Sequence, residues 1–572
     1  MDITLSKEIT NHLGKKLELF GLTEDRQHWK NQTYEPFEID LSALTKTRAR
    51  QLKELLESAG KIKGATARVA DIDRWLAILE GEKVRCRKLA DFAPMLKQYL
   101  KDAPRHWIYE LRKDSEVYQP YYVAFIKYNP PESGRYYVPG YVTMFLYWEE
   151  LGKVEVYKEI FYAKDCVDLT VGAALAQRGY TLEAPDILKS YQDNKRRYHE
   201  LSKQIGLQCT ATGVAEKEFD DDEDRWYRRK TQIILDKEGI PSRVVIDVIN
   251  EGDTKQSTGE KPPDSSFWTR DGCDFEGKED DDDEDIEPGD EDDTDPAEKE
   301  IPVLPLCPAV MCFDLKRHCR LKLYIEQLTK YTYQKDLADK LVLPDEITSL
   351  VEMLVAHKGG FKDIIGTKGG GAVILCAGPP GTGKTLTAEI YSEAMSRPLY
   401  SVQCSQLGTD PDGLEKELMI VFARSQRWNS ILLLDEADVY VAARGHDLTQ
   451  NAIVGVFLRV LEYYNGVLFM TTNRADLVDD AVASRCLARI TYQIPTKENQ
   501  ARIWSTLAET AGIKLVKAEI DKVVAQFPKL SGRDVKNLLK LGSMVSAANG
   551  EALTANTIAF VKRFKPTDDL EE

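Results

Sequence analysis

The chain has 572 residues, 42% of them hydrophobic, which is enough for about two to four domains with cores of their own. Its net charge of −17 is concentrated in residues 279–298, where 14 acidic residues occur without a Lys or Arg, and leaving these charges out brings the rest of the chain to −3. The near-neutral charge of the remainder argues against a large nucleic-acid-binding surface, and the apolar runs are too short to span a membrane. The ten cysteines are scattered and the N-terminal residues contain no apolar leader, which indicates a cytoplasmic protein with reduced thiols.

The first region, residues 1–100, is predicted to be mostly helical. Apolar residues recur at three- and four-residue spacing in 41–58 and 69–80, which is the period of an amphipathic helix. Such helices can dock a partner or cover a local core. The second alternative is favoured, with Trp75 as part of that core.

Residues 101–250 carry aromatic and β-branched runs separated by turn residues, and these predict a β-rich domain. A long polar helix is expected at 184–203, and two further strands at 226–235 and 242–249. Tyrosines gather in this domain, where they can pack in half-buried strands, anchor a protein partner or stack on bases. These uses are preferred in that order, because Lys and Arg are sparse around the cluster. The clustered tyrosines are Tyr118, Tyr121, Tyr122, Tyr136, Tyr137 and Tyr141.

Residues 251–304 are rich in Gly, Pro, Ser, Asp and Glu and poor in large apolar residues. Such a composition predicts disorder, because the segment cannot bury enough apolar surface to fold. It can link two domains, dock a basic partner or mimic nucleic acid, and a linker is favoured.

Four residues with metal-binding chemistry follow this linker. Metal sites usually present their ligands as close pairs two to four residues apart, and the spacing here departs from that pattern. Structural roles are therefore preferred over a metal site. The four residues are Cys307, Cys312, His318 and Cys319.

A P-loop is predicted where the apolar run 372–377 leads into a glycine-rich turn and then into a helical pattern. Small residues let backbone N–H groups point at phosphate, and the helix N-terminus adds a positive dipole end. Lys384 is expected to reach the β- and γ-phosphates of ATP, and the Thr385 hydroxyl to hold Mg²⁺. The residues expected to bind the nucleotide are Gly378, Pro379, Pro380, Gly381, Thr382, Gly383, Lys384, Thr385 and Leu386.

Two later strands end in polar residues that complete a hydrolytic site. One apolar strand ends in Asp435 and Glu436, and the next is followed by Asn473. Asp435 is expected to join Thr385 as a metal ligand for Mg²⁺, Glu436 to polarise the attacking water, and Asn473 to help position that water. Alternating strands and helices predict a parallel sheet, which would bring these strand ends together.

The run at 435–438 spells the motif of DEAD-box helicases, but its neighbours do not match that class and no second RecA-like domain is visible. With the P-loop, the segments 471–473, 479–485 and 530–534 instead resemble those of an AAA+ ATPase. Further motifs make residues 305–510 most similar to a group of AAA ATPases that is common in fungal genomes and related to the BCS1-like branch. These motifs lie at 343–345, 397–400, 407–411 and 457–459.

The resemblance implies further roles. Arg485 corresponds to the arginine finger, which would act in trans on a neighbour's γ-phosphate, and Arg533 to the sensor-2 residue of the helical lid. Many relatives carry a second finger three residues on, where this chain has Ala488, while Arg489 is out of register. A finger acting in trans implies a homo-oligomeric ring, usually a hexamer. The loop at 404–413 lacks the aromatic residue with which threading unfoldases grip an extended chain.

The expected fold is α/β. An AAA+ P-loop parallel sheet at 305–495 is followed by a helical lid and acidic tail at 496–572, and preceded by an α+β N-terminal domain and the acidic disordered linker. The expected function is ATP hydrolysis with Mg²⁺ in a ring that remodels or moves a protein partner, which the N-terminal domain selects. The alternatives are a nucleic-acid-stimulated ATPase and a nucleotide-gated sensor or scaffold in a stress or defence system.

Overall fold

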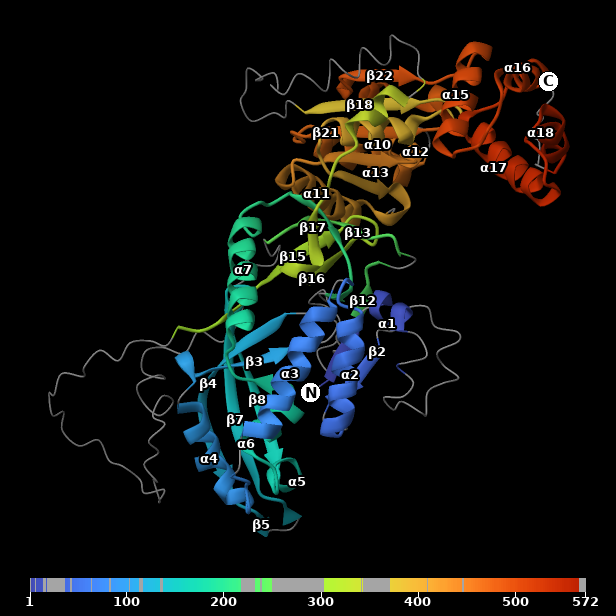
Figure 1. The fold of residues 1–572 in the computed structure, drawn as a ribbon. Coiled ribbons are helices and arrows are strands. Elements are labelled where there is room, and N and C mark those ends of the chain that lie inside the picture. Colours follow the sequence, from blue (N-terminus) through green and yellow to red (C-terminus); the bar gives the residue numbers. More distant parts are fainter. Residues whose placement is uncertain are drawn as a thin grey trace, which may run out of the picture.

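The computed structural model describes residues 2–13, 17, 37–112, 117–133, 137–217, 232–248, 303–342 and 371–564, apart from gaps of one or two residues at 6, 42–43, 63, 82–83, 102, 237–238, 341, 409 and 445–446. These residues form three tiers in Figure 1, with the N-terminus in the lower tier and the C-terminus beside the upper one. Nearly all of the linker predicted at 251–304 lies outside the described residues. None of the helices described is long and apolar enough to cross a membrane.

The lower tier has two parts with separate cores. A two-stranded sheet packs with the first helices around Trp75, which is 3% exposed and confirms the prediction of a core residue. A larger antiparallel sheet has the strand order β14-β7-β4-β3-β9, with β8 on the other edge of β7, and carries α4–α6 on one face and α7 on the other. The elements of the first part are β1 (Asp2–Leu5), α1 (Lys7–Leu13), β2 (Phe37–Asp40), α2 (Lys46–Ser58) and α3 (Ala65–Gly81). Those of the second are α4 (Leu89–Lys101), β3 (Trp107–Leu111), β4 (Tyr118–Asn129), β5 (Glu132–Ser133), β6 (Tyr137–Val138), β7 (Tyr141–Glu150), β8 (Lys153–Tyr162), α5 (Ala163–Cys166), α6 (Val171–Gln177), β9 (Tyr180–Thr181), α7 (Pro185–Leu201) and β14 (Leu306–Cys307).

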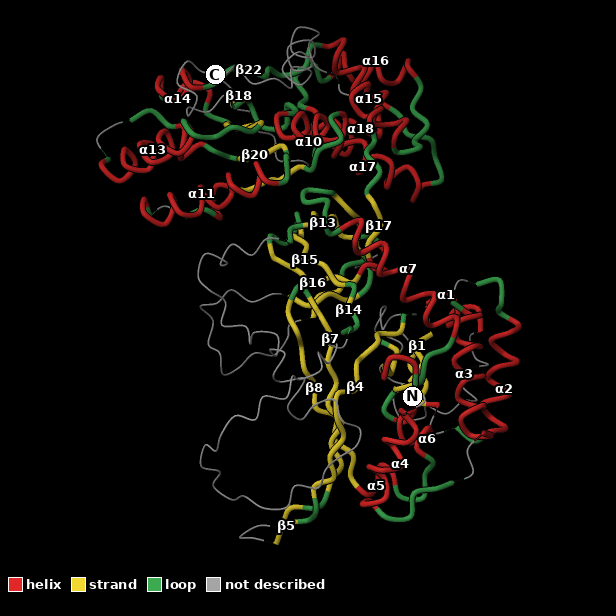
Figure 2. Tube along the Cα trace, turned by 90° about the vertical axis from the view of Figure 1, so that its left-hand side faces the viewer, coloured by secondary structure: helices red, strands yellow, loops and turns green. Residues whose placement is uncertain are grey.

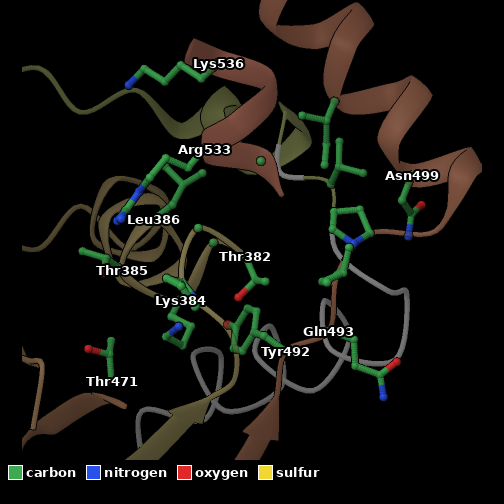
Figure 3. A pocket seen from close by; sticks show the side chains of 18 of the residues that line it. Thr382, Lys384, Thr385, Leu386, Thr471, Tyr492, Gln493, Asn499, Arg533 and Lys536 are labelled. Carbon is green, nitrogen blue, oxygen red and sulfur yellow. The ribbon is translucent and has the colours of Figure 1, made fainter. Parts of the chain in front are cut away.

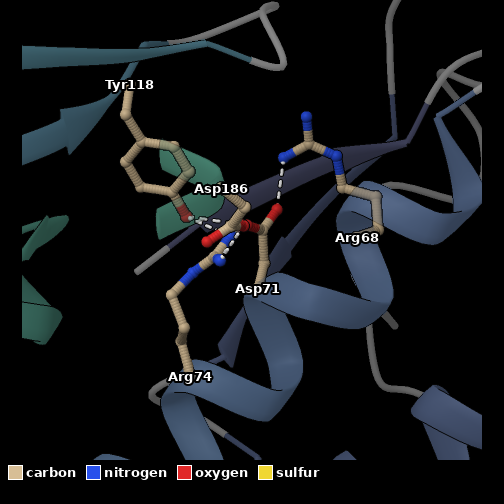
Figure 4. Close-up of polar contacts among 5 residues, drawn as sticks. All are labelled: Arg68, Asp71, Arg74, Tyr118 and Asp186. Atoms are coloured by element: carbon tan, nitrogen blue, oxygen red, sulfur yellow. Dashed lines mark hydrogen bonds and ion pairs between the residues drawn. The ribbon is translucent and has the colours of Figure 1, made fainter. Parts of the chain in front are cut away.

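A buried ionic cluster joins these two parts (Figure 4). Asp71 of α3 is 2% exposed and accepts from Arg68 Nη1 at 2.8 Å and from the Tyr118 hydroxyl at 2.7 Å. Arg74 contacts the same carboxylate and reaches Asp186 Oδ2, in the first turn of α7, at 2.6 Å. A buried carboxylate needs such partners, since an unpaired charge in the interior is costly. Tyr118 is therefore a structural donor and its ring is not available for stacking.

The middle tier is a seven-stranded antiparallel sheet assembled from two distant stretches of chain. Strands from 208–246 pair with strands from 309–330, in the order β12-β11-β16-β15-β13-β10-β17. The predicted boundary at 305 therefore differs from the structure: the first strands assigned to the ATPase unit complete this antiparallel sheet instead. The strands are β10 (Gln208–Ala211), β11 (Val214–Lys217), β12 (Gln232–Ile234), β13 (Ser242–Ile246), β15 (Ala309–Asp314), β16 (Cys319–Tyr324) and β17 (Leu328–Lys330).

The upper tier is a parallel five-stranded sheet with the order β19-β20-β21-β18-β22, covered by helices on both faces, and this confirms the predicted fold class (Figure 2). The interior of its central strands is fully apolar, as expected when helices cover both faces. Its elements are β18 (Ala372–Ala377), α10 (Lys384–Ala394), β19 (Leu399–Gln403), α11 (Pro411–Arg427), β20 (Ile431–Asp435), α12 (Asp438–Val441), α13 (Leu448–Leu461), β21 (Val467–Thr472), α14 (Asp480–Arg485) and β22 (Ala488–Thr491). The C-terminal helices around Trp504 are α15 (Lys497–Thr510), α16 (Lys517–Gln526), α17 (Gly532–Asn549) and α18 (Ala555–Lys562).

Two carboxylates attach the middle tier to the upper tier. Glu393, in the last turn of α10, is 5% exposed and accepts from Arg243 Nη1 at 3.1 Å, the Tyr331 hydroxyl at 2.7 Å and the Gln334 N–H at 2.9 Å. The last turn of a helix is unfavourable for a negative charge, so these donors hold Glu393 there. The second attachment is the bidentate pair of Arg427, at the end of α11, with Asp247, at 2.9 and 2.7 Å.

The backbones of the two tiers also approach each other at Gly206, which has φ +85°. A Cβ there would lie 2.6 Å from the carbonyl oxygen of Trp428. We therefore expect Gly206→Ala to lower the free energy of unfolding by roughly 1–3 kcal/mol more than Gly152→Ala, because overpacking is added to the backbone strain. Gly152 is the matched control, since it has φ +76° and a Cβ there would meet nothing within 4 Å. Equal losses in thermal and urea unfolding of the two variants would contradict the close approach.

Candidate nucleotide-binding site

The glycine-rich turn joins a buried strand to a helix, as the sequence predicts. Strand β18 ends at Ala377, and Gly383 is the N-cap of α10, with a left-handed φ of +102°. The helix therefore begins at Lys384 with its N-terminus directed at the loop. Backbone N–H groups and the positive end of the helix dipole form a site for an anion at this point.

Lys384 lies against oxygen atoms. The residue is 7% exposed, and its Nζ donates to the carbonyl oxygens of Gly378 and Pro379 at 2.8 and 2.7 Å and to Asn473 Oδ1 at 2.9 Å. Burial lowers the pKa of the Lys384 ammonium, while the negative charges of Asp435 and Asp438 oppose that shift. The three acceptors are neutral, so a phosphate oxygen would supply the ammonium with a charged partner.

The end of β20 places an acid beside the first turn of α10. Asp435 Oδ1 accepts from the hydroxyls of Thr385 at 2.9 Å and Thr471 at 2.6 Å. Glu436 follows at the solvent-exposed edge with φ +56°. Thr385 and Asp435 bring two hard oxygen ligands together next to the anion site. This is the donor set that Mg²⁺ takes from a protein when phosphates supply further ligands.

The end of the neighbouring strand β21 holds Asn473. Its side-chain oxygen contacts Lys384, and its backbone N–H donates to Asp438 Oδ1 at 3.1 Å. The Thr472 hydroxyl donates to the same carboxylate oxygen. Asp435, Glu436 and Asn473 therefore lie around the P-loop lysine, because β20 and β21 are adjacent parallel strands that end at the same edge of the sheet.

The C-terminal helices contact the P-loop directly. Arg533 lies in the first turn of α17, where Ser531 and Asp534 form a capping box. The Arg533 N–H donates to the Gly381 carbonyl at 3.3 Å, and a Cβ at Gly381 would lie 2.8 Å from both Arg533 Cβ and Ser531 Oγ. Only glycine leaves room for this approach, which brings Arg533 to the nucleotide side of the loop.

These groups line one pocket of about 1080 Å³ (Figure 3). Its walls come from the P-loop, the ends of β20 and β21, the segment that connects β22 to α15, and the two helices α15 and α17. The predicted Gly378 and Pro379 are not among the lining residues. The eleven predicted residues that line the pocket are Pro380, Gly381, Thr382, Gly383, Lys384, Thr385, Leu386, Asp435, Glu436, Asn473 and Arg533.

Part of the pocket was not anticipated from the sequence. The connection from β22 to α15 forms one wall, and the Tyr492 hydroxyl in it donates to Thr387 Oγ1 at 2.9 Å. Glu389 and Lys536 extend the lining along α10 and α17, and burial together with the charge of Asp435 raises the pKa of Glu389. Pro495 lies between the last strand and the first lid helix, so the sequence did indicate a non-helical connection at this point. Its lining residues are Tyr492, Gln493, Ile494, Pro495, Thr496 and Asn499.

Arg485 lies apart from this pocket. It ends α14, its side chain is 38% exposed, and its Nη2 lies 4.0 Å from Glu462 Oε2. Arg489, in β22, does line the pocket and donates to the Ala475 carbonyl at 2.7 Å. The two arginines therefore face different surroundings within one subunit.

The tyrosine cluster and the cysteines have structural surroundings. Tyr118 and Tyr122 are buried, Tyr121 and Tyr141 are half-buried, and Tyr137 is 71% exposed, whereas Tyr136 lies outside the described residues. Cys307 and Cys312 are buried, and Cys319 is half-buried. The His318 ring lies 5.6 Å from that of Tyr400, and burial lowers its pKa. The described part of the chain contains no group of three His, Cys, Asp or Glu side chains that could hold a metal ion.

Comparisons with known proteins agree with this geometry. Residues 374–494 match the model of the "ATPase family associated with various cellular activities (AAA)". A 26S proteasome regulatory subunit homolog of Methanothermobacter thermautotrophicus is 28% identical over 29% of this chain and 46% of its own length. The ATP-dependent zinc metalloproteases FtsH 1 of Phytoplasma mali and FtsH 3 of Sphaerobacter thermophilus are 26% and 27% identical, over 41% and 31% of this chain and 40% and 38% of their own lengths. The chain thus spans less than half of each of these relatives.

Among solved structures, the AAA domain of FIGL-1 in complex with ADP matches 34% of this chain and 73% of its own, at 20% identity and a TM-score of 0.29.

Proposed function

We propose that this chain, whose residues 374–494 are an AAA ATPase domain, binds ATP with Mg²⁺ and hydrolyses it. One observation carries the proposal: a phosphate-directed lysine, a pair of candidate metal ligands, an exposed acid and a lid arginine line the same pocket. Each of these groups has a function in phosphoryl transfer, where catalysis is mainly positioning and charge stabilisation.

In this proposal Lys384 contacts the β- and γ-phosphates, and Thr385 and Asp435 would hold Mg²⁺, which neutralises charge on the phosphates when bound. Glu436 accepts the proton of the attacking water, and Asn473 orients that water. Arg533 contacts the nucleotide from the lid, so that the lid position responds to the phosphates. Tyr492 and the segment after it face the remaining part of the nucleotide.

Hydrolysis is proposed to need a second subunit. Arg485 is absent from the pocket lining of its own chain but lies half-exposed at the end of α14, which supports its action in trans in a homo-oligomeric ring, a hexamer by analogy with the resembled family. The same proposal includes membership of residues 305–510 in the group of AAA ATPases that is common in fungal genomes and related to the BCS1-like branch.

The ring is tested by mixing two inactive variants. Arg485→Ala is expected to bind ATP normally and to hydrolyse it about 10³-fold more slowly or worse, because the transition-state charge loses its cation. Lys384→Ala cannot bind ATP but still offers Arg485 to a neighbour. Mixed subunits should therefore regain part of the activity, measured as phosphate release. Full activity of Arg485→Ala alone, or no gain on mixing, would contradict the action in trans.

The work of the ring is proposed to be the remodelling or movement of a protein partner in the cytoplasm. The loop at 404–413, which has no aromatic residue, argues for a switch acting on a folded partner over threading of an extended chain. Glu436→Gln, purified with ATP from its native cells, would retain such a partner. A dominant protein by mass spectrometry supports this proposal, and nuclease-sensitive material in its place would overturn it.

A further inference from the structure

We infer that Thr471 is a positioning residue for hydrolysis, which sets the conformation of Glu436 and the orientation of Asp435. The inference rests on the proposed ATPase function and concerns a residue that touches neither phosphate nor water in that proposal. Thr471 is 2% exposed and lies at the end of β21, on the side of the pocket that holds Lys384 and Thr385 (Figure 3).

The Thr471 hydroxyl is fully engaged with the acidic pair. It donates to Asp435 Oδ1 at 2.6 Å and accepts the Glu436 N–H at 2.9 Å. The Thr471 carbonyl in turn accepts the Ala437 N–H at 2.8 Å. Three consecutive residues, 435–437, are therefore connected to this one threonine.

The bond to the Glu436 N–H matters because of the backbone there. Glu436 has φ +56°, a left-handed conformation that is unfavourable for a residue with a Cβ. Such a conformation persists only where its surroundings hold it. The Thr471 Oγ1 is the side-chain acceptor for the N–H of that residue, so its loss allows Glu436 to relax to negative φ and to point its carboxylate elsewhere.

The bond to Asp435 fixes the second acid. Asp435 Oδ1 takes hydroxyls from two sides, Thr471 at 2.6 Å and Thr385 at 2.9 Å. Together they set the rotation of the carboxylate relative to Thr385, the other candidate Mg²⁺ ligand. The Thr471 hydroxyl therefore positions both Asp435, a candidate Mg²⁺ ligand, and Glu436, the proposed acceptor of the proton from water. A misplacement of about 1 Å at such a site can cost about 10²-fold in rate.

The test compares Thr471→Val with Thr471→Ser. Valine keeps the shape and removes the hydroxyl, while serine keeps the hydroxyl and removes a methyl group. We expect Thr471→Val to lower kcat about 10–100-fold with KM for ATP changed less than about threefold, and Thr471→Ser to recover most of kcat. Thr510→Val, on the exposed face of α15, is the matched control and should retain wild-type kcat and KM.

A second readout does not depend on ATP turnover. Amide hydrogen exchange of the Glu436 N–H should be about tenfold faster or more in Thr471→Val than in wild type, and restored in Thr471→Ser, because the N–H has lost its acceptor. Unchanged exchange, or wild-type kcat in a Thr471→Val protein with fast exchange, would overturn the inference. If the wild-type chain has no ATPase activity but the Glu436 N–H still exchanges faster in Thr471→Val than in wild type, the proposed function is overturned and the positioning of Glu436 by Thr471 remains supported.

Discussion

Replacing Lys384 with alanine is expected to abolish nucleotide binding. The ammonium is buried among three oxygen acceptors at 2.7–2.9 Å, and phosphate oxygens would give it charge-assisted bonds of about 1.5–3 kcal/mol each. The loss of two such bonds should raise the Kd of a fluorescent ATP analogue by at least about 100-fold.

Lys540→Ala provides the control for a general charge effect. Lys540 is an exposed lysine of α17 outside the pocket lining, and its variant should bind the analogue with wild-type affinity. Wild-type affinity in Lys384→Ala would contradict the assignment of this lysine to the phosphates.

Replacing Glu436 with glutamine is expected to separate binding from turnover. Glutamine keeps the size of the side chain but cannot accept a proton from water, and loss of a general base typically costs about 10²–10⁴-fold in rate. The variant should bind ATP with near wild-type Kd while phosphate release falls by at least about 100-fold. Single-turnover measurements with excess protein would show whether the chemical step itself is slowed.

Glu417→Gln is the control for this second prediction, since Glu417 is an exposed acid of α11 away from the pocket. Full turnover in Glu436→Gln would remove Glu436 from the mechanism. Loss of ATP binding in the same variant would also count against the assignment, because the role derived for Glu436 concerns water and not the nucleotide.

The central groups of the site could be found from the sequence because each lies in a local pattern. The P-loop residues follow one another along the chain, and Asp435 directly ends an apolar strand. Parallel packing of β20 and β21 then brings Asn473 to the same edge without further information. C-terminal helices were also expected at 496–572, since their apolar period and caps such as Thr496 and Ser531 are local signals.

Other features depend on contacts between distant residues and left no local signal. The pairing of β13 with β15 joins positions more than 60 residues apart, so residues 309–330 were expected in the ATPase unit, whereas they form strands of the antiparallel sheet. In the sequence, Thr471 is an ordinary threonine near the end of a strand. Its proposed role follows only from the backbone conformation of Glu436, which comes directly after the neighbouring strand β20. Tyr118 was expected to pack in a half-buried strand, but the sequence does not reveal that its hydroxyl donates to Asp71.

Because of the contacts of Glu393, helix α10 links the candidate phosphate site directly to the antiparallel tier. Its first residue meets the phosphates in the proposed site, and its last turn is fastened to Arg243, Tyr331 and Gln334 of the antiparallel tier. At ~1.5 Å per residue its 11 residues span ~16 Å, and a helix of this length hardly compresses. Arg427 and Asp247 form a second attachment, so we expect the two upper sheets to move together. In the proposed ATPase we therefore expect nucleotide-dependent movement at the two ends of this unit, which are the segment after Tyr492 and helix α7.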